Sequence, residues 1–307
     1  MNYSRRDFLK AAAAVAAAMG GPLGGVGPVG KALARETEDG GLPVVWIEAQ
    51  SCTGCSVSLL NSMTFGAIED VLLDVLDVNF HGALMAAAGR TSVAAAERAY
   101  RRGGYALCVE GSIPSAADGK YCYVWPGVTA TKAIERYARR ASVIMGVGAC
   151  ACFGGMPGGT PNPTGAKGLA DSYFGKRVIR IPGCPTHPDW VVGTIAHIIA
   201  NGEVPPLDMY GRPLTFFADT VHEKCAYYPG GDNEASTLGE KGCLAGLGCK
   251  GPFTRSDCPN RRWNVATPGE PGVNWCIGAG TPCFGCTEPF FPDGMSPFYY
   301  LEPEEAD

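Results

Sequence analysis

Cysteine is the residue of this chain best suited to chemistry, and there are 14 of them. Five lie in three short motifs of the first two thirds, namely SCTGC at 51–55, GACACFGG at 148–155 and PGCPTHPDW at 182–190. Seven more, together with one histidine, lie in the last third. Thiolates are ligands for zinc and for iron–sulfur clusters, whereas an even number of cysteines in an exported chain also suits disulfides.

The first candidate ligand set is predicted at one edge of a parallel sheet. Its members are Cys52, Cys55, Cys150 and Cys184. The strands predicted directly before these cysteines are 44–48, 142–147 and 177–181. Loops at the carboxyl ends of parallel strands converge at the switch point where ligands bind. Four thiolates there suit a [4Fe–4S] cluster or zinc; Cys152 competes with Cys150 for the third position, and we favour Cys150.

Two further sets are predicted in the C-terminal segment. One contains His222, Cys225, Cys243 and Cys249, and the other contains Cys258, Cys276, Cys283 and Cys286. A histidine three residues before a cysteine is typical of metal ligation and has no role in a disulfide. Two cysteines remain. Cys108, inside a predicted strand at 105–109, is interpreted as a small buried apolar residue, and Cys122 as the same or as packing near the first set.

The first 34 residues are predicted to be a twin-arginine export signal. Arg5 and Arg6 are followed by the apolar stretch Ala11–Met19, and Ala32 and Ala34 supply small residues for cleavage. This route exports proteins folded in the reducing cytoplasm, which weighs against disulfides. The G-x-G-x-x-G match at 25–30 lies in the same signal and follows no strand, so it is rejected as a nucleotide site.

Alternating strand and helix patterns predict an α/β fold, a doubly wound parallel sheet, over residues 42–203. Helices are expected near 56–65, 91–102, 129–140 and 189–200, with a further strand at 75–80. Residues 204–307 are rich in Pro, Gly and Cys and predict a smaller irregular domain held by its metal sites. The net charge of −5 argues against nucleic acid as a partner. No other stretch matches a bilayer span, so membrane association would come from the signal or another subunit.

Several motifs together resemble one family. They are CTGCSVSLLN (52–61), VEGSIP (109–114), GACACFGGMP (148–157), PNPTGA (161–166), PGCPTHPDWVVGT (182–194), GRPLTFFADTVHEKC (211–225), GCLAGLGCKGP (242–252) and PCFGCTEPFFPDGMSPFY (282–299). The chain is similar to the iron–sulfur small subunit of group 1 [NiFe] hydrogenases over its mature length. The resemblance implies a periplasmic H2-uptake enzyme whose Ni–Fe catalysis resides in a large subunit.

The resemblance also implies a flavodoxin-like first domain and three clusters. The proximal [4Fe–4S] would use Cys52, Cys55, Cys150 and Cys184, and the distal [4Fe–4S] would use His222, Cys225, Cys243 and Cys249. Many relatives have Pro where Cys276 stands, and they hold a medial [3Fe–4S] cluster. Here the resemblance to the [NiFeSe] branch implies a medial [4Fe–4S] cluster on Cys258, Cys276, Cys283 and Cys286. If Cys276 is not a ligand, the medial cluster would be a [3Fe–4S].

The expected acceptor is a multihaem cytochrome c or a membrane electron acceptor. Two alternatives stay open. One is a cluster-bearing subunit of a quinone-reducing complex, whose α/β domain carries a similar proximal cluster. The other is an exported binding protein stabilised by zinc or disulfides.

Overall fold

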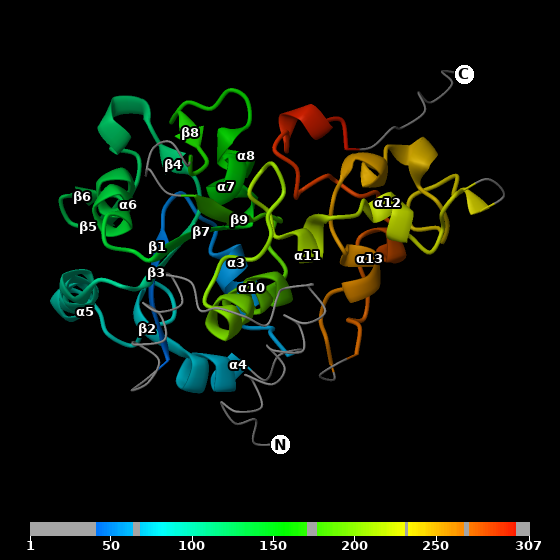
Figure 1. Ribbon diagram of the computed structural model, residues 1–307. Helices are drawn as coiled ribbons and strands as arrows, with labels where there is room; N and C mark the ends of the chain where they lie inside the picture. Colours follow the sequence, from blue (N-terminus) through cyan, green and yellow to red (C-terminus); the bar gives the residue numbers. More distant parts are fainter. Residues whose placement is uncertain (1–40, 64–67, 171–176, 231–232, 267–269, 299–307) are drawn as a thin grey trace.

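The computed structural model describes residues 41–63, 68–170, 177–230, 233–266 and 270–298. The predicted export signal at 1–34 and the G-x-G-x-x-G match at 25–30 lie outside the described residues, as does the end of the helix expected at 56–65. Figure 1 shows an α/β part beside a part built from loops and short helices, which contains the chain beyond α11 (Leu214–Phe217).

A five-stranded parallel sheet organises the α/β part. Its strands lie in the order β2-β1-β3-β7-β9. Their bounds are Leu42–Glu48 for β1, Leu76–His81 for β2, Ala106–Glu110 for β3, Val143–Val147 for β7 and Val178–Ile181 for β9. This is the flavodoxin-like order, in which the direction of winding reverses between β1 and β3 and a ligand site forms beyond their carboxyl ends. The predicted fold class is therefore confirmed.

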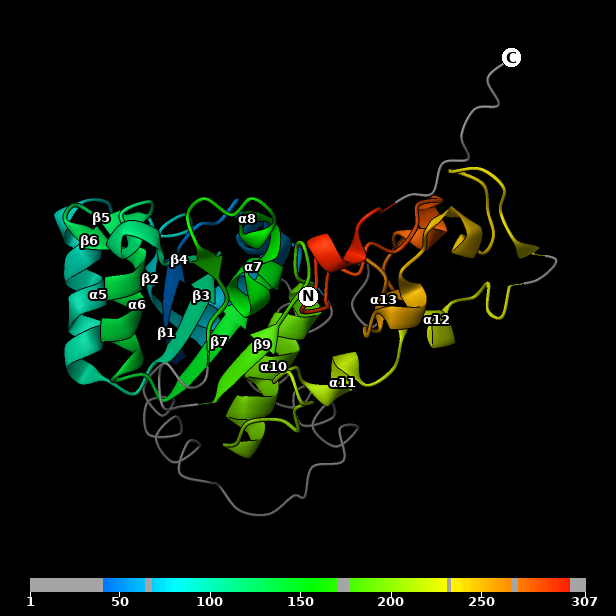
Figure 2. The ribbon, with the colours of Figure 1, turned by 90° about the horizontal axis from the view of Figure 1, so that it is seen from above.

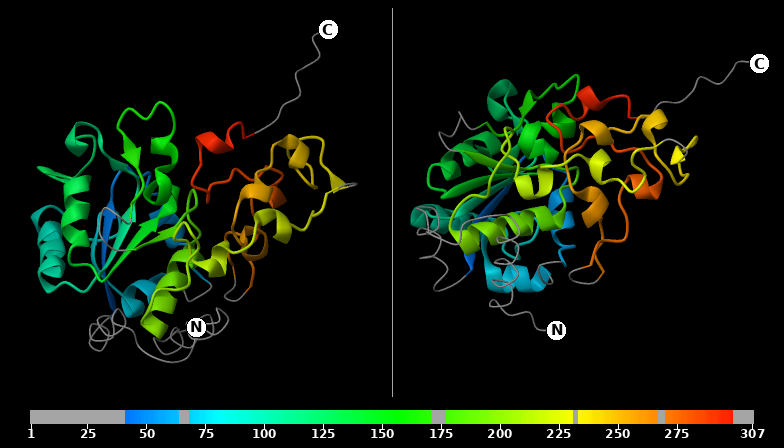
Figure 3. Two further views of the ribbon diagram at one scale, coloured as in Figure 1. Left: turned by 45° about the horizontal axis from the view of Figure 1, so that its top comes forward. Right: turned by 45° about the vertical axis from the view of Figure 1, so that its right-hand side comes forward.

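Helices cover both faces of the sheet because alternate strand residues point to opposite sides. Val44 and Trp46 of β1 pack in one core with residues of α3 (Gly54–Leu59) and α10 (Pro188–Asn201). Val45 and Ile47 pack in a second core with α5 (Arg90–Arg102) and α6 (Ala130–Ala138). Figures 2 and 3 show α5 and α6 on the side of the sheet away from α10.

The remaining elements are short. Within the α/β part they are α4 (Ile68–Asp70), η1 (Val71–Val75), β4 (Ile113–Pro114), η2 (Ala116–Gly119), β5 (Tyr123–Trp125), β6 (Val128–Thr129), α7 (Gly148–Phe153), α8 (Gly155–Gly158) and β8 (Ala166–Lys167). Beyond α11 they are α12 (Val221–Lys224), η4 (Ala245–Leu247), η5 (Gly251–Phe253), α13 (Cys258–Arg261), η6 (Ile277–Ala279) and η7 (Asp293–Met295). The described helices include none long and apolar enough to cross a bilayer.

Among the described residues of the C-terminal part, the apolar clusters are small. Its main cluster contains Val221, Leu244, Trp275 and Ile277, against which several cysteines pack. A buried arginine ties this part to the loop after α10. Arg212 is 1% exposed and pairs with Asp208 at 2.7 Å and Glu288 at 2.8 Å.

Candidate metal centres

Three loops bring the first cysteine set together at the carboxyl edge of the sheet. Cys52 and Cys55 follow β1, Cys150 lies in α7 directly after β7, and Cys184 follows β9. Burial raises the pKa of the Cys55 thiol, and the nearby charges of Glu110, Cys150 and Cys184 raise it further. Burial raises the pKa of Cys150 to about 11, with Cys184 and Cys52 adding to the effect. Cys55 therefore lies near Cys150 and Cys184, and Cys150 lies near Cys184 and Cys52.

Two glycines make room for these sulfurs. At Gly148, where φ is +87°, a Cβ atom would lie 2.5 Å from Cys55 Sγ. At Gly155, where φ is +51°, a Cβ atom would lie 2.8 Å from Cys150 Sγ. Any larger side chain would strain the backbone and push against a thiol, so both positions require glycine.

Glu110, at the end of β3, accepts hydrogen bonds from the loop that carries Cys52 and Cys55. Its side chain is 1% exposed. One carboxylate oxygen accepts from Ser51 Oγ at 2.8 Å and from the Cys55 backbone N–H at 3.1 Å. The other accepts from Trp46 Nε1 at 3.1 Å and from Ser56 Oγ at 2.5 Å. The motif VEGSIP contains this residue, but its spacing did not indicate that it holds the cysteine loop. The sequence feature that could have indicated this role is a charged residue at the end of an apolar strand beside the cysteine loops.

Cys150 and Cys152 differ in where their thiols lie. Cys152 is 2% exposed, and its Sγ donates to the Gly146 carbonyl at 3.2 Å, back toward β7. Cys150 is instead among the nearby groups that raise the pKa of the Cys55 thiol. Cys108 is fully buried in β3, as expected. Cys122 packs partly against the core beneath α5 and α6.

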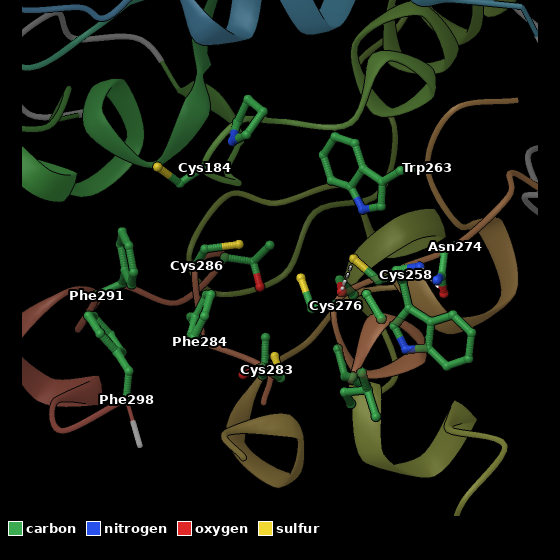
Figure 4. Close-up of a pocket in the computed structure, with 18 residues that line it drawn as sticks. Cys184, Cys258, Trp263, Asn274, Cys276, Cys283, Phe284, Cys286, Phe291 and Phe298 are labelled. Atoms are coloured by element: carbon green, nitrogen blue, oxygen red, sulfur yellow. Dashed lines mark hydrogen bonds between the residues drawn. The ribbon is translucent and has the colours of Figure 1, made fainter. Parts of the chain in front are cut away.

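The second set surrounds a cavity of about 540 Å³ between the two parts of the chain. Its lining includes Cys258, Cys276, Cys283 and Cys286, and also Cys184 of the first set (Figure 4). Burial raises the pKa of Cys283 to about 12, with Cys249 and Cys276 contributing. Burial and the charges of Cys258, Cys283 and Cys276 raise the pKa of Cys286.

The third set lies around α12. A capping box between Thr220 and Glu223 starts this short helix, which carries His222 and is followed directly by Cys225. Burial raises the pKa of Cys225, and Cys249 and Cys243 raise it further, so these three thiols are neighbours. The His222 ring lies edge-on to Tyr228, with centroids 4.7 Å apart.

Each set borders the next. Cys184 of the first set and Cys286 of the second line the same cavity, and the Cys184 backbone lies close enough to Cys286 to lower the pKa of its thiol. The Cys283 backbone N–H donates to Cys249 Sγ at 3.4 Å, which connects the second and third. The set in the middle is therefore the one that comes last in the sequence.

The donor chemistry fits iron–sulfur clusters. All 14 cysteines are free thiols. The cavity beside the second set has predominantly apolar walls, and the degree of shielding from water is one factor that sets the potential of a cluster. In the described ranges, no group of three or more His, Cys, Asp and Glu side chains lies close enough together to hold a single metal ion.

The other histidines have structural partners. His81 stacks on Trp46 with centroids 5.1 Å apart and bonds to Ser56 Oγ at 3.1 Å. His187 accepts from the Asp189 backbone N–H through Nδ1, so its Nε2 donates to the Arg262 carbonyl at 2.6 Å. His197 is 1% exposed on α10.

Comparison with known proteins decides between the families left open. Residues 52–198 match a family described as NADH ubiquinone oxidoreductase, 20 Kd subunit, and residues 217–299 match the family of C-terminal regions of the NiFe/NiFeSe hydrogenase small subunit. The periplasmic [NiFeSe] hydrogenase small subunit of Desulfomicrobium baculatum is 40% identical over 98% of this chain and all of that protein. This chain belongs to the [NiFe]/[NiFeSe] hydrogenase small subunits.

Structural similarity agrees with this assignment. The reduced, active Ni-Fe-Se hydrogenase of Desulfomicrobium baculatum matches with a TM-score of 0.78 at 41% identity, covering 85% of this chain and 100% of that chain. A periplasmic [NiFe] hydrogenase small subunit of Nitratidesulfovibrio vulgaris is 37% identical over 96% of this chain and 93% of that protein. The 20 Kd subunit family matches only residues 52–198, whereas the hydrogenase C-terminal family also matches residues 217–299, which favours a hydrogenase subunit over the quinone-reducing alternative.

The chain is an iron–sulfur subunit of an oxidoreductase, and it is exported to the periplasm. Residues 2–22 match the twin-arginine translocation signal family, which confirms the predicted export route. The predicted cleavage after Ala34 lies outside the described residues.

Proposed function

We propose that this subunit relays single electrons between a Ni–Fe site in a large hydrogenase subunit and an external acceptor, through three [4Fe–4S] clusters. The ligands would be Cys52, Cys55, Cys150 and Cys184 for the proximal cluster, Cys258, Cys276, Cys283 and Cys286 for the medial, and His222, Cys225, Cys243 and Cys249 for the distal. A signal peptide at 1–34, a cluster-bearing α/β domain at 42–203 and a two-cluster domain at 204–307 make up the proposed organisation.

The observation that carries the proposal is the succession of contacts between the three sets. Cys184 and Cys286 line one cavity, and the Cys283 backbone N–H donates to Cys249 Sγ, so each set borders the next. Bound clusters would supply one-electron redox chemistry at potentials tuned by ligands, hydrogen bonds and exposure. The protein contributes the order of the sites, the burial of their thiols and N–H donors directed at sulfur.

Cys276 supports a four-iron medial site. Its thiol lines the same cavity as Cys258, Cys283 and Cys286, and its charge affects the pKa of Cys286. A four-iron cluster needs four protein ligands, and three of these residues alone would leave one iron without a side chain.

The large subunit would cover the surface around the proximal set. Cys52 and Cys184 are exposed there. The apolar side chains of Val57 on α3 and Met156 beside Cys150 are 57% and 55% exposed. Obligate interfaces have apolar cores, so this surface suits a permanent partner.

The acceptor would approach the opposite end of the relay. His222 and Tyr228 lie there, with Tyr228 55% exposed. Replacing an anionic thiolate by a neutral imidazole makes the distal site less negative, which should ease its reduction. A multihaem cytochrome c, or a membrane acceptor reached through another subunit, is the proposed partner.

The test is the metal content of the purified heterodimer. Iron and acid-labile sulfide matching three four-iron clusters, with broad brown absorbance, are the expected result. Zinc in place of iron, or thiols that resist alkylation until a reductant is added, would refute the proposal in favour of a zinc- or disulfide-stabilised protein.

A further inference from the structure

A group of four side chains joins the first turn of α10 to α13, and we call these residues, Asp189, Trp190, Asp257 and Arg261, the clamp. Arg261 pairs with Asp189 at 3.1 Å and with Asp257 at 2.6 Å. Trp190 Nε1 donates to the other oxygen of Asp257 at 2.7 Å. Asp257 therefore binds one partner in each part of the chain.

The clamp is largely withdrawn from solvent. Asp189 is 1% exposed and Trp190 is fully buried, while Arg261 and Asp257 are each 21% exposed. Charge-assisted hydrogen bonds in such surroundings are shorter and stronger than neutral ones, and the fork of an arginine fixes direction as well as distance. The clamp therefore constrains how α13 can rotate or shift relative to α10.

Aromatic rings fill the space beside the clamp. The Trp263 ring lies 4.7 Å from the His187 ring and 6.2 Å from the Trp190 ring, centroid to centroid. Trp263 also lines the cavity that contains the second cysteine set (Figure 4). The His187 side chain adds a hydrogen bond to the Arg262 carbonyl, directly after Arg261. This packing leaves the clamp little freedom to rearrange.

The position of the clamp in the sequence links the two candidate sites. Cys184 of the proximal set lies five residues before Asp189, and Cys258 of the medial set directly follows Asp257. Ser256 and Cys258 are themselves bonded, with Oγ to Sγ at 3.1 Å, so the backbone around the medial thiol is well fixed. A shift of α13 against α10 would move Cys258 relative to Cys184.

We propose that the clamp residues are positioning residues that set the separation and orientation of the proximal and medial sites, and so control the rate at which an electron passes between them. This rests on the proposed ligand sets. The step moves one electron from one site to the other, with no bond formed or broken and no proton transferred. A second buried ion pair, Arg212 with Glu288, ties the segment two residues after Cys286 to the loop after α10.

The experiment compares three variants in the assembled heterodimer. Arg261→Lys keeps the charge but loses the two-pronged contact, and Trp190→Phe removes one donor and no charge. Arg136→Lys is the matched control, since Arg136 forms a 2.6 Å pair with Glu97 on the far side of the sheet. Each is measured by iron content, hydrogen isotope exchange, acceptor reduction and the magnetic coupling between clusters in EPR of the H2-reduced protein.

Both clamp variants should retain iron and isotope exchange, lose severalfold in acceptor reduction, and show altered coupling between two neighbouring clusters, whereas Arg136→Lys should match wild type. Unaltered coupling and acceptor reduction in the clamp variants would overturn the proposal. Equal loss of isotope exchange and acceptor reduction would also overturn it, because the clamp would then serve only folding. If Arg261→Lys fails to assemble, Trp190→Phe decides. Wild-type protein lacking the expected iron would instead refute the ligand sets.

Discussion

Replacing Glu110 by Gln should loosen the loop that carries Cys52 and Cys55. One carboxylate oxygen of Glu110 accepts from the Cys55 backbone N–H, and the other accepts from Trp46 Nε1, both at 3.1 Å. A glutamine side chain places an NH2 group on one of these two sides in either orientation. One fixed donor would therefore face another donor inside the protein, with Glu110 only 1% exposed.

The size of the effect follows from that single lost acceptor. A buried donor without a partner costs about 1–3 kcal/mol. Because each 1.4 kcal/mol is about a factor of ten in an equilibrium constant, local opening of the loop should become about 5- to 150-fold more frequent. The two serine hydroxyls can turn to accept from the new amide, so they add little to this cost.

Hydrogen exchange of the assembled heterodimer measures the opening directly. Peptides covering residues 50–60 should exchange faster in Glu110→Gln, while peptides from α10 keep the wild-type rate. Glu97→Gln is the control, because Glu97 bonds Arg136 and Tyr137 on the opposite side of the sheet. It should leave both regions unchanged.

A second substitution tests the reasoning more sharply. Trp46→Phe removes the Nε1 donor and keeps an aromatic ring beside His81. In that background the glutamine can direct its NH2 toward the vacated side, so Glu110→Gln should cost much less than in wild type. Wild-type exchange in Glu110→Gln, or an equal effect with and without Trp46, would refute this account of the loop.

Three further predictions concern the relay and its export. Oxidised wild-type protein should lack the EPR signal of a [3Fe–4S] cluster, and Cys276→Ala should gain it with a raised medial potential; a near-stoichiometric three-iron signal in wild type would contradict the assignment. His222→Ala should retain isotope exchange while acceptor reduction falls sharply, and equal loss of both would give His222 a structural role. Changing Arg5 and Arg6 to Lys should hold both subunits in the cytoplasm, and normal export would contradict the twin-arginine mechanism.

The sequence was most informative where structure is local. The five parallel strands were predicted to within one or two residues, because buried strands form short apolar runs bounded by glycine and polar residues. Since parallel strands share one edge, the positions of the cysteine loops followed from the strands. The helix predicted at 129–140 ends at Ala138, within the usual uncertainty of a helix end.

Side-chain pairings across the chain were not predictable in the same way. Glu110 meets Trp46 from another strand, and Arg261 meets Asp189 from 72 residues away. No spacing rule encodes such contacts, because they depend on how whole elements pack. Cys150 and Cys152 are likewise ambiguous in sequence; in the structure, the turn of α7 directs one thiol toward the other cysteine loops and the other toward Gly146.

The order of the cysteine sets in space follows from the path of the chain. The chain forms the first set, runs out to His222 and Cys249, and then returns to supply Cys258 through Cys286. The returning segment borders both of the other sets, because Cys286 lines the same cavity as Cys184 and the Cys283 backbone N–H donates to Cys249 Sγ. The second set, which comes last in the sequence, therefore lies beside both of the other sets. With clusters bound as proposed, the second set would lie between the first and the third, so an electron relayed along the three sites would cross it.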